Sequence, residues 1–360
     1  MKLCFIADAT SIHIINWLKY FVERGHRVFL ITDTENTLQG AQVHLIGDCL
    51  PFFNIPVLSA SLQIYRKIKK IKQLIRKIQP DIVHAHYATN YGFLAAKTGF
   101  HPLLVTCHGS DLLLDPDKDM INRYFVKFAL RNSDIITLPS QQMAEMAIGL
   151  TQKSKNISIL QYGIDTNLFQ FRQRTMSSKT TFISSRALLP KYRIDLLIQA
   201  FYKLSLDYPD IELIIVGKGP QEVGLKKLAI DLKICDKVFF AGEKTNFEMN
   251  NYYHQAEFYV TTSPTDGLSV SLQEALACGC FPILPDNDSN LEVEKQGFQV
   301  ELYRTNEIDS LYFKMKKSLE RKSNLIYMVE NNAKLVRQYY SRETNLAKIE
   351  RLYQKLTGGF

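Results

Sequence analysis

The sharpest chemical feature of this sequence is an acidic residue and a glycine placed between an apolar segment and a helix-forming segment. The apolar segment ends near Thr262, and a helix is predicted to begin near Ser269. Asp266 and Gly267 lie in the loop between them. The first N–H groups of a helix lack intrahelical partners, so they bind anions such as phosphate, and a glycine lets the ligand approach closely. Taken alone, the segment also fits a structural interpretation, in which Asp266 caps the helix and Glu274 faces solvent.

A pair of basic residues, Arg186 and Lys191, forms the second feature. Both lie in the loop that directly follows the predicted strand Thr181–Ser185. A planar guanidinium and a compact ammonium on one loop can together clamp a diphosphate. Taken alone, the pair is also what an ordinary solvated basic loop would contain.

The third feature is a histidine at the carboxyl end of a predicted strand in the first half of the chain. His108 follows the strand Leu103–Cys107, and Gly109 permits a tight turn beside it. Because open α/β sheets bind ligands at the carboxyl ends of their strands, His108 is a candidate for substrate contact. The alternative is a structural histidine whose ring is hydrogen-bonded to the backbone.

Two weaker patterns do not support a dinucleotide or a metal site. The turn Gly217-Lys218-Gly219-Pro220 lacks the third glycine of the dinucleotide-binding fingerprint. His84 and His86 could ligate a metal, but they occupy a predicted buried strand without nearby carboxylates, so we interpret them as structural. The six cysteines form neither a CxxC pair nor a disulfide framework; they are Cys4, Cys49, Cys107, Cys235, Cys278 and Cys280. No metal and no cofactor is therefore expected.

One predicted helix, Ile64–Gln79, has an isoleucine face and an opposite face rich in basic residues. The basic residues are Arg66, Lys67, Lys69, Lys70, Lys72, Arg76 and Lys77. The simpler interpretation is a solvated surface helix that packs on a sheet. The functional one is docking to anionic lipid, with about 1 kcal/mol for each basic residue near the surface. Nucleic acid is not expected, because basic and aromatic residues do not alternate as they do in nucleic-acid readers.

The elements that position these residues alternate between short apolar runs and longer helical patterns, which indicates a doubly wound α/β fold. A polar stretch at 171–181 is the best candidate for a linker. We therefore predict an N-terminal Rossmann-like domain at 1–172, a second one at 173–340, and a C-terminal helix at 341–360 that crosses back to the first domain. Two such domains imply a cleft that binds ligands.

Bulk properties agree with a globular protein that has anionic partners. The formal net charge is +8, which suits nucleotides or acidic lipids without selecting between them. The apolar start of the chain reaches Asp8 too early for a signal segment, and no apolar run is long enough for a membrane span. We therefore expect a cytoplasmic protein, with peripheral contact to the inner membrane face if the basic helix binds lipid.

Together these segments resemble the family-4 glycosyltransferases, a retaining group with the two-domain GT-B fold. The resemblance spans nearly the whole chain. In the first half it rests on Ser11-x-His13-x3-Trp17, Arg24-Gly25-His26-x-Val28, Pro80–His86, Thr106-x-His108-Gly109-x-Asp111 and Tyr162-Gly163-Ile164-Asp165-x3-Phe169. In the second half it rests on Arg186-x4-Lys191 with Asp195, Val216-Gly217-x-Gly219-Pro220, and Asp266-x7-Glu274 followed by Ala275-x-Ala277-x-Gly279.

The resemblance implies metal-independent hexosyl transfer with retained anomeric configuration. It assigns the donor ribose to Glu274, the leaving diphosphate to Arg186 and Lys191, and the transferred sugar to His108. Asp266 would contact the sugar and phosphates, and it is a catalytic candidate together with His108, Arg186 and Lys191. The other donor-binding candidates are Gly267, Leu268, Ser269, Gly217, Asp8 and His13. The donor would be a nucleotide-diphosphate sugar, with UDP favoured over GDP, and the acceptor a saccharide or a lipid-linked molecule in polysaccharide, lipopolysaccharide or glycolipid synthesis.

One departure from the family pattern leaves the donor sugar open. Asp266 stands where glutamate is usual, and its side chain is shorter by one methylene. Two alternatives share the fold: a sugar-nucleotide epimerase of GT-B type, and a non-catalytic partner subunit. The joint presence of Arg186, Lys191 and Glu274 argues against the second, because a scaffold without turnover does not need all three.

Overall fold

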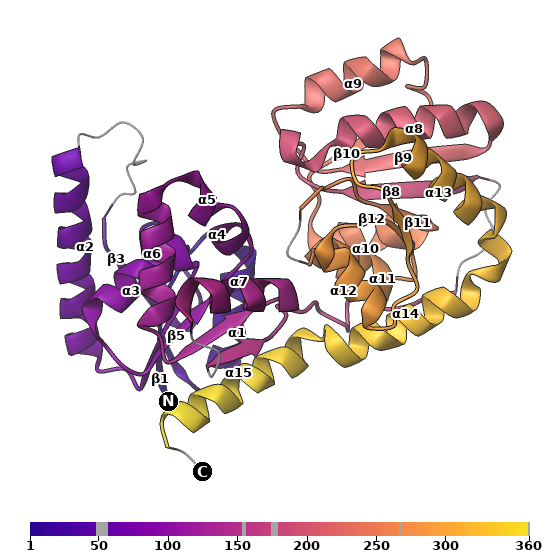
Figure 1. Cartoon of the computed structure of the whole chain (residues 1–360). Helices are drawn as coiled ribbons and strands as arrows, with labels where there is room; N and C mark the ends of the chain where they lie inside the picture. The colour runs from indigo at the N-terminus through magenta and orange to yellow at the C-terminus, as the bar shows by residue number, and fades with distance from the viewer. Residues whose placement is uncertain (48–56, 153–155, 174–178, 266–267, 359–360) are drawn as a thin grey trace. The chain divides into compact units, whose positions relative to one another are not determined.

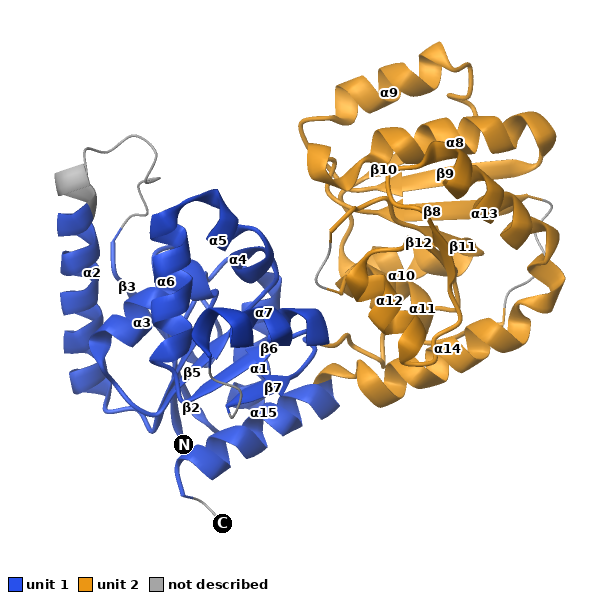
Figure 2. Cartoon of the chain, viewed as in Figure 1, with its two compact units in different colours: residues 1–162, 343–360 blue, residues 163–342 orange. Residues whose placement is uncertain are grey.

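The computed structural model describes residues 1–47, 57–152, 156–173, 179–265 and 268–358, with the backbone alone for 57–60. The chain divides into two compact units (Figure 2). Unit 1 contains Met1–Tyr162 and Glu343–Phe360, and unit 2 contains Gly163–Arg342. Asp266, Gly267 and Cys49 of the sequence analysis lie outside the described residues.

The described residues of unit 1 form one parallel sheet of seven strands in the order β3-β2-β1-β4-β5-β6-β7 (Figure 1). The strands are β1 (Lys2–Ile6), β2 (Arg27–Thr32), β3 (Ala41–Leu45), β4 (Ile82–His86), β5 (Leu103–Thr106), β6 (Ile135–Leu138) and β7 (Ile157–Ile159). The helices are α1 (Ile12–Glu23), α2 (Val57–Ile78), α3 (Phe93–Thr98), α4 (Ser110–Leu113), α5 (Asp115–Lys118), α6 (Met120–Arg131), α7 (Gln141–Thr151) and, at the end of the chain, α15 (Arg342–Leu356).

Helices cover both faces of the unit 1 sheet, which explains why its central strands are apolar without alternation. On one face α1 and α15 pack together and bury Trp17, Phe21, Ile349 and Tyr353. On the other face α2, α3, α6 and α7 bury their apolar stripes against the same strands. Each fully buried large apolar side chain contributes about 1.5–3 kcal/mol. The C-terminal helix predicted from the sequence is therefore an integral part of the core of unit 1.

The described residues of unit 2 form a parallel sheet of six strands in the order β10-β9-β8-β11-β12-β13 (Figure 1). The strands are β8 (Thr180–Ser185), β9 (Ile211–Val216), β10 (Val238–Gly242), β11 (Phe258–Val260), β12 (Phe281–Pro285) and β13 (Glu301–Tyr303). The helices are α8 (Ile194–Asp207), α9 (Glu222–Asp231), α10 (Asn246–Gln255), α11 (Val270–Ala277), α12 (Asp288–Lys295), α13 (Ile308–Glu320) and α14 (Ile326–Tyr339).

Two parallel, doubly wound sheets confirm the predicted fold class, but the boundary between the units differs from the predicted one. The structure divides the chain after Tyr162 rather than after Arg172. The reason is that Ile164 and Phe169 are buried in the core of unit 2, so the polar stretch that follows them is not the boundary. The edge strand β3 has no buried residue and no continuous apolar run, so the pattern of apolar segments does not predict it.

Candidate active site

Unit 2 gathers its candidate residues at the carboxyl ends of its central strands. Arg186 follows β8, Gly217 follows β9, and Thr262 lies in the segment after β11. β8 lies between β9 and β11, where the order of the strands reverses. Loops diverge at such a point, and open α/β sheets bind ligands in the space between them.

Tyr192 brings the two predicted cations of this edge together. The guanidinium carbon of Arg186 lies 5.2 Å from the centre of the Tyr192 ring, and Nζ of Lys191 lies 4.9 Å from the same centre. Each cation–ring contact of this kind contributes about 0.5–1 kcal/mol at an exposed site. The Tyr192 carbonyl accepts a hydrogen bond of 2.7 Å from Oγ1 of Thr262. One anchored ring therefore holds both positive charges and connects their loop to the segment after β11.

The helix predicted to begin near Ser269 is α11, and Ser269 is its N-cap. Oγ of Ser269 accepts a hydrogen bond from the backbone nitrogen of Leu272 at 3.4 Å. Leu268, directly before the cap, has a φ of 63°, a region that bulky residues rarely occupy. Strained backbone of this kind clusters at ligand-binding turns. The contacts expected of Asp266 and Gly267 stay predictions, because both residues lie outside the described part of the chain.

Glu274 lies on α11 and is buried, with 9% of its surface exposed. The Tyr253 hydroxyl donates a hydrogen bond of 3.2 Å to Oε2 of Glu274, and the same hydroxyl lies 2.8 Å from Oγ of Ser185. Burial raises the pKa of Glu274 to about 7, against the opposing effects of the Tyr253 hydrogen bond and the positive charge of Arg342. This burial excludes the alternative in which Glu274 is a solvated helix residue.

In unit 1, Asp111 holds the loop that carries His108. Its Oδ1 accepts hydrogen bonds from the backbone nitrogens of His108 and Gly109, both at 2.9 Å, and its Oδ2 accepts one from Ala88 at 2.8 Å. Asp111 is fully buried, and burial raises its pKa to about 6 although the three N–H groups oppose this. Sequence reasoning gave Asp111 no role. Its position three residues after His108, at the start of α4, is the signal that could have found it, because short acidic side chains cap nearby N–H groups.

His108 belongs to a cluster of imidazole and aromatic rings within unit 1. Nε2 of His108 lies 3.2 Å from Nδ1 of His86, and its ring centre lies 5.0 Å from that of Tyr162. His13 also stacks on Tyr162, with ring centres 5.1 Å apart. Burial is the main cause that lowers the pKa of His108 to about 3, and electrostatic repulsion from His13 is a smaller one. The ring is therefore neutral at ordinary pH and offers one N–H donor and one acceptor.

The His84–His86 pair lies in β4, where both rings are buried and stack with centres 4.2 Å apart. Nε2 of His84 lies 2.6 Å from Oγ1 of Thr106, and its Nδ1 bonds the hydroxyl of Tyr353 on α15. Within the described ranges, no group of three or more histidine, cysteine, aspartate or glutamate side chains could hold a metal ion.

Asp8, at the end of β1, closes the turn into α1. Its Oδ1 accepts hydrogen bonds from the backbone nitrogen and hydroxyl of Thr10, at 2.9 and 2.8 Å, and from the hydroxyl of Thr34 at 2.9 Å. These bonds give Asp8 a structural role, and a contact between Asp8 and a donor stays a prediction.

The basic helix α2 presents most but not all of its cations to solvent. Ile71, Ile75 and Ile78 are buried against the sheet. Lys67 differs from the other basic residues because its Nζ lies 2.9 Å from Oδ1 of Asp33, a buried carboxylate at the end of β2. Lys67 therefore neutralises a core charge rather than adding to the exposed basic face. Among the described helices, none is both long and apolar enough to cross a bilayer.

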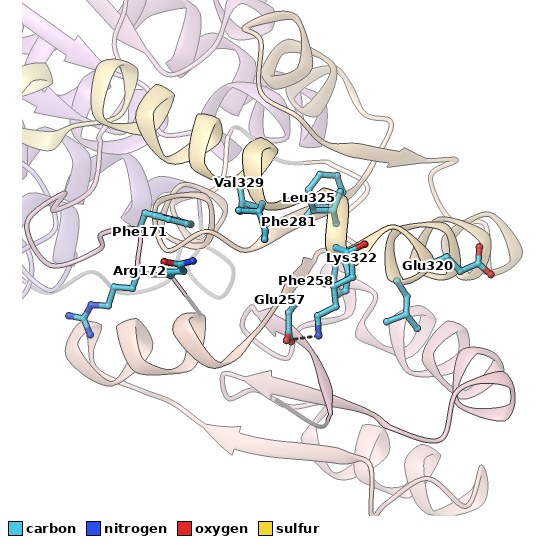
Figure 3. Close-up of a pocket in the computed structure, with 13 residues that line it drawn as sticks. Phe171, Arg172, Glu257, Phe258, Phe281, Glu320, Lys322, Leu325 and Val329 are labelled. Carbon is cyan, nitrogen blue, oxygen red and sulfur yellow. Dashed lines mark ion pairs between the residues drawn. The ribbon is translucent and has the colours of Figure 1, made fainter. Parts of the chain in front are cut away.

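Unit 2 also contains a pocket of about 610 Å³, and Figure 3 shows residues that line it. Its walls include Phe258 and Phe281, the first residues of β11 and β12, and it contains an ion pair of 2.8 Å between Glu257 and Lys322. The pocket is thus at the amino ends of the strands, opposite the edge that carries Arg186. It is not the candidate donor site.

Comparison with known proteins identifies the family. Residues 2–141 match the family model described as glycosyl transferase 4-like, and residues 165–335 match the model for glycosyl transferases group 1. This chain belongs to the family-4 glycosyltransferases. As a family member, this glycosyltransferase is a sugar-transferring enzyme, which agrees with the expectation drawn from its motifs.

Two curated relatives illustrate the range of this family. The glycosyltransferase is 25% identical over 280 residues to N-acetyl-alpha-D-glucosaminyl L-malate synthase of Bacillus anthracis. The aligned region covers 72% of this chain and 71% of the relative. It is 26% identical over 298 residues to alpha-monoglucosyldiacylglycerol synthase of Streptococcus pneumoniae. This aligned region covers 75% of this chain and 66% of the relative.

Solved structures share the fold of this glycosyltransferase over its full length. HepE of Anabaena in complex with UDP superposes with a TM-score of 0.81 at 16% identity, covering 99% of this chain and all of HepE. Sucrose-phosphate synthase of Thermosynechococcus elongatus gives a TM-score of 0.81 at 15% identity, with both chains fully covered. At these identities the likeness shows the GT-B fold, and the site must be argued from this chain's own residues.

Proposed function

We propose that this glycosyltransferase moves a sugar from a nucleotide-diphosphate donor, UDP-linked in preference to GDP-linked, with retained anomeric configuration and without a metal. The main observation behind the proposal is that Arg186 and Lys191 both contact the ring of Tyr192 near the carboxyl end of β8. Two cations held there suit a diphosphate, because its negative charge grows as the bond to the sugar breaks. Preorganised positive groups stabilise such a leaving group, and one such donor contributes about 100-fold or more in rate.

The other candidate residues take the remaining roles in the proposed transfer. Glu274 hydrogen-bonds the ribose, with Tyr253 holding its carboxyl group in place. The capped start of α11 at Ser269 offers backbone N–H groups to the phosphates, and His108 contacts the transferred sugar. The complexes of HepE with UDP and with UDP-glucose support a UDP-sugar as the donor.

The acceptor is proposed to be a saccharide or a lipid-linked molecule in polysaccharide, lipopolysaccharide or glycolipid synthesis. Support comes from relatives whose names include a diacylglycerol glucoside and phosphatidylinositol. We also propose that α2 brings the enzyme to an anionic membrane surface on the cytoplasmic side. Its exposed residues Tyr65, Arg66, Lys69 and Lys70 combine an aromatic ring with several positive charges, which suits the interface of such a membrane.

The proposal is tested by incubating the enzyme with UDP-, GDP-, ADP- and dTDP-sugars, with and without a lipid extract, in parallel reactions that contain or lack EDTA. Nucleotide release that requires the extract, together with an NMR spectrum showing the anomer of the donor in the product, is the expected result. Conversion of the donor sugar without any acceptor would instead identify an epimerase. Nucleotide binding without release or conversion would identify a non-catalytic subunit, and release that stops with EDTA would refute metal independence.

A further inference from the structure

His86 and His108 share a proton whose position determines what His108 can offer a substrate. Nδ1 of His86 and Nε2 of His108 are 3.2 Å apart, and burial lowers the pKa of both imidazoles, so both rings are neutral. In a hydrogen bond between two neutral imidazoles, one nitrogen carries the proton and the other accepts it. If His86 donates, the second nitrogen of His108, Nδ1, carries an N–H. If His108 donates, its Nδ1 has only a lone pair.

The surroundings of His86 select one of these arrangements. His86 is 1% exposed, and its Nε2 has no hydrogen-bond partner among the described residues. The ring is enclosed by Phe5, His84 and Trp17, with centres 6.0, 4.2 and 4.8 Å away. A buried N–H without an acceptor is rarer in proteins than a buried acceptor without a donor, and leaving a polar group unpaired carries a desolvation penalty. The enclosure therefore favours an unprotonated Nε2, which leaves the proton of His86 on Nδ1.

Trp17 adds an independent reason. Its indole Nε1 is buried and, in the described part of the chain, also has no hydrogen-bond partner. The Trp17 ring meets the ring of His86 almost perpendicularly, at 85°. A protonated Nε2 on His86 would add a second buried N–H without a partner to that of Trp17, and each such group carries a desolvation penalty.

We propose that His86 donates its Nδ1 proton to Nε2 of His108 and thereby fixes His108 as an Nδ1–H donor to a hydroxyl of the transferred sugar. Within the described residues, Nδ1 of His108 makes no hydrogen bond, so this donor is available to a ligand. His86 does not touch the substrate and acts as a positioning residue. The sugar contact rests on the proposed function, whereas the tautomer of the two rings does not.

The tautomers can be measured directly by NMR on the full chain labelled with 15N-histidine. Protonated and unprotonated nitrogens of a neutral imidazole resonate in separate 15N regions, so the assignment does not require activity. The chain has eight histidines, and the spectra of His86→Asn and His108→Asn assign the two signals of interest. We expect the proton on Nδ1 in both rings. A proton on Nε2 of His86 would overturn the proposal.

Kinetics of matched variants test the consequence. His86→Asn retains an amide N–H near the position of Nδ1, and His86→Leu removes the donor. We expect kcat to fall on the order of tenfold in His86→Leu and to recover in His86→Asn, because one oriented hydrogen bond is lost and then replaced. UDP affinity should be unchanged in both variants, since UDP lacks the transferred sugar that His108 is proposed to contact. Equal loss of kcat in the two variants would contradict the positioning role.

A control variant separates positioning from damage to the core. His84→Asn changes the neighbouring buried imidazole, which bonds Thr106 and Tyr353 but not His108. We expect it to lower stability while kcat stays close to wild type, and a fall in kcat as large as that of His86→Leu would also contradict the proposal. If the wild-type enzyme transfers no sugar, the proposed function fails, and the 15N spectrum still decides the tautomer.

Discussion

The backbone of Gly217 lies so close to Arg186 that a Cβ atom on Gly217 would be 2.1 Å from the Arg186 carbonyl oxygen. Gly217 also has a φ of 137°, which residues with a side chain rarely adopt. The backbone nitrogen of Arg186 is bonded to the carbonyl of Val216 at 3.1 Å. The turn after β9 thus sets the position of the loop that carries the proposed diphosphate contacts.

Gly217→Ala should therefore weaken nucleotide binding, because the added methyl group must displace the backbone of Arg186. We expect the UDP dissociation constant to rise about tenfold or more and the free energy of unfolding to fall by about 1–3 kcal/mol. Calorimetric titration and urea denaturation measure the two effects. The control is Gly224→Ala on α9, where a Cβ meets open space, so stability should stay the same or rise by up to about 1 kcal/mol. Wild-type UDP affinity in Gly217→Ala would contradict the assignment.

Tyr192 should contribute to donor binding through its ring rather than its hydroxyl. Tyr192→Leu removes the surface that orients Arg186 and Lys191, and two lost cation–ring contacts correspond to a weakening of UDP binding by about 5- to 30-fold. Tyr192→Phe keeps the ring and should bind UDP like the wild type. If both variants bind equally weakly, the hydroxyl and not the ring is responsible.

Glu274 should make stability decrease as the pH rises. Its folded-state pKa is about 7, above the ordinary value of 4.5, so the folded protein binds more protons than the unfolded chain between these values. The stabilising effect is fully present below about pH 4.5 and is lost as the pH rises through about 7, with a total of about 3 kcal/mol. Urea denaturation across this range, compared with Glu274→Gln, measures the effect. A parallel pH dependence in both proteins would rule out Glu274 as its source.

Asp111→Asn should destabilise the loop of His108, because an amide has one acceptor oxygen and turns an N–H group toward backbone donors. We expect unfolding to become easier by about 1–3 kcal/mol and kcat to fall, while UDP affinity is retained. Asp119→Asn is the matched control. Asp119 caps α6 by accepting from the backbone of Asn122, and asparagine caps helices equally well. A similar loss of stability in both variants would indicate that the three hydrogen bonds accepted by Asp111 contribute no more than an ordinary helix cap.

Lys69 and Lys67 should behave differently although both lie on α2. Lys69→Glu reverses an exposed charge and should weaken flotation with anionic vesicles in a salt-dependent way, without loss of stability. Lys67→Met removes the ion pair between Lys67 and the buried carboxylate of Asp33, and breaking such a pair should lower stability by about 3–5 kcal/mol. Lys227→Glu on α9 is the control for net charge alone. Vesicle binding that is equal in the two glutamate variants would reject α2 as the docking surface.

Much of the fold was predictable because its determinants are local. Continuous apolar runs such as those of β2 and β5 arise wherever helices cover both faces of a strand. The isoleucine stripe of α2 and the capped start of α11 at Ser269 can also be predicted, because each depends only on residues that are close together in the sequence. Boundaries were harder, since Ile164 and Phe169 belong to unit 2 through burial that local pattern does not reveal.

The sequence by itself determined the alternation of strands and helices, although not the edge strand β3. It also determined the family motifs and the residue types available at each strand end. Only the tertiary structure decided which of them meet. The contact between His86 and His108 depends on β4 and β5 lying side by side. The ion pair between Lys67 and Asp33 depends on α2 passing the end of β2. Sequence spacing contains neither relationship, because the contacts of a side chain are set by the neighbours that packing brings to it and by the water that packing removes.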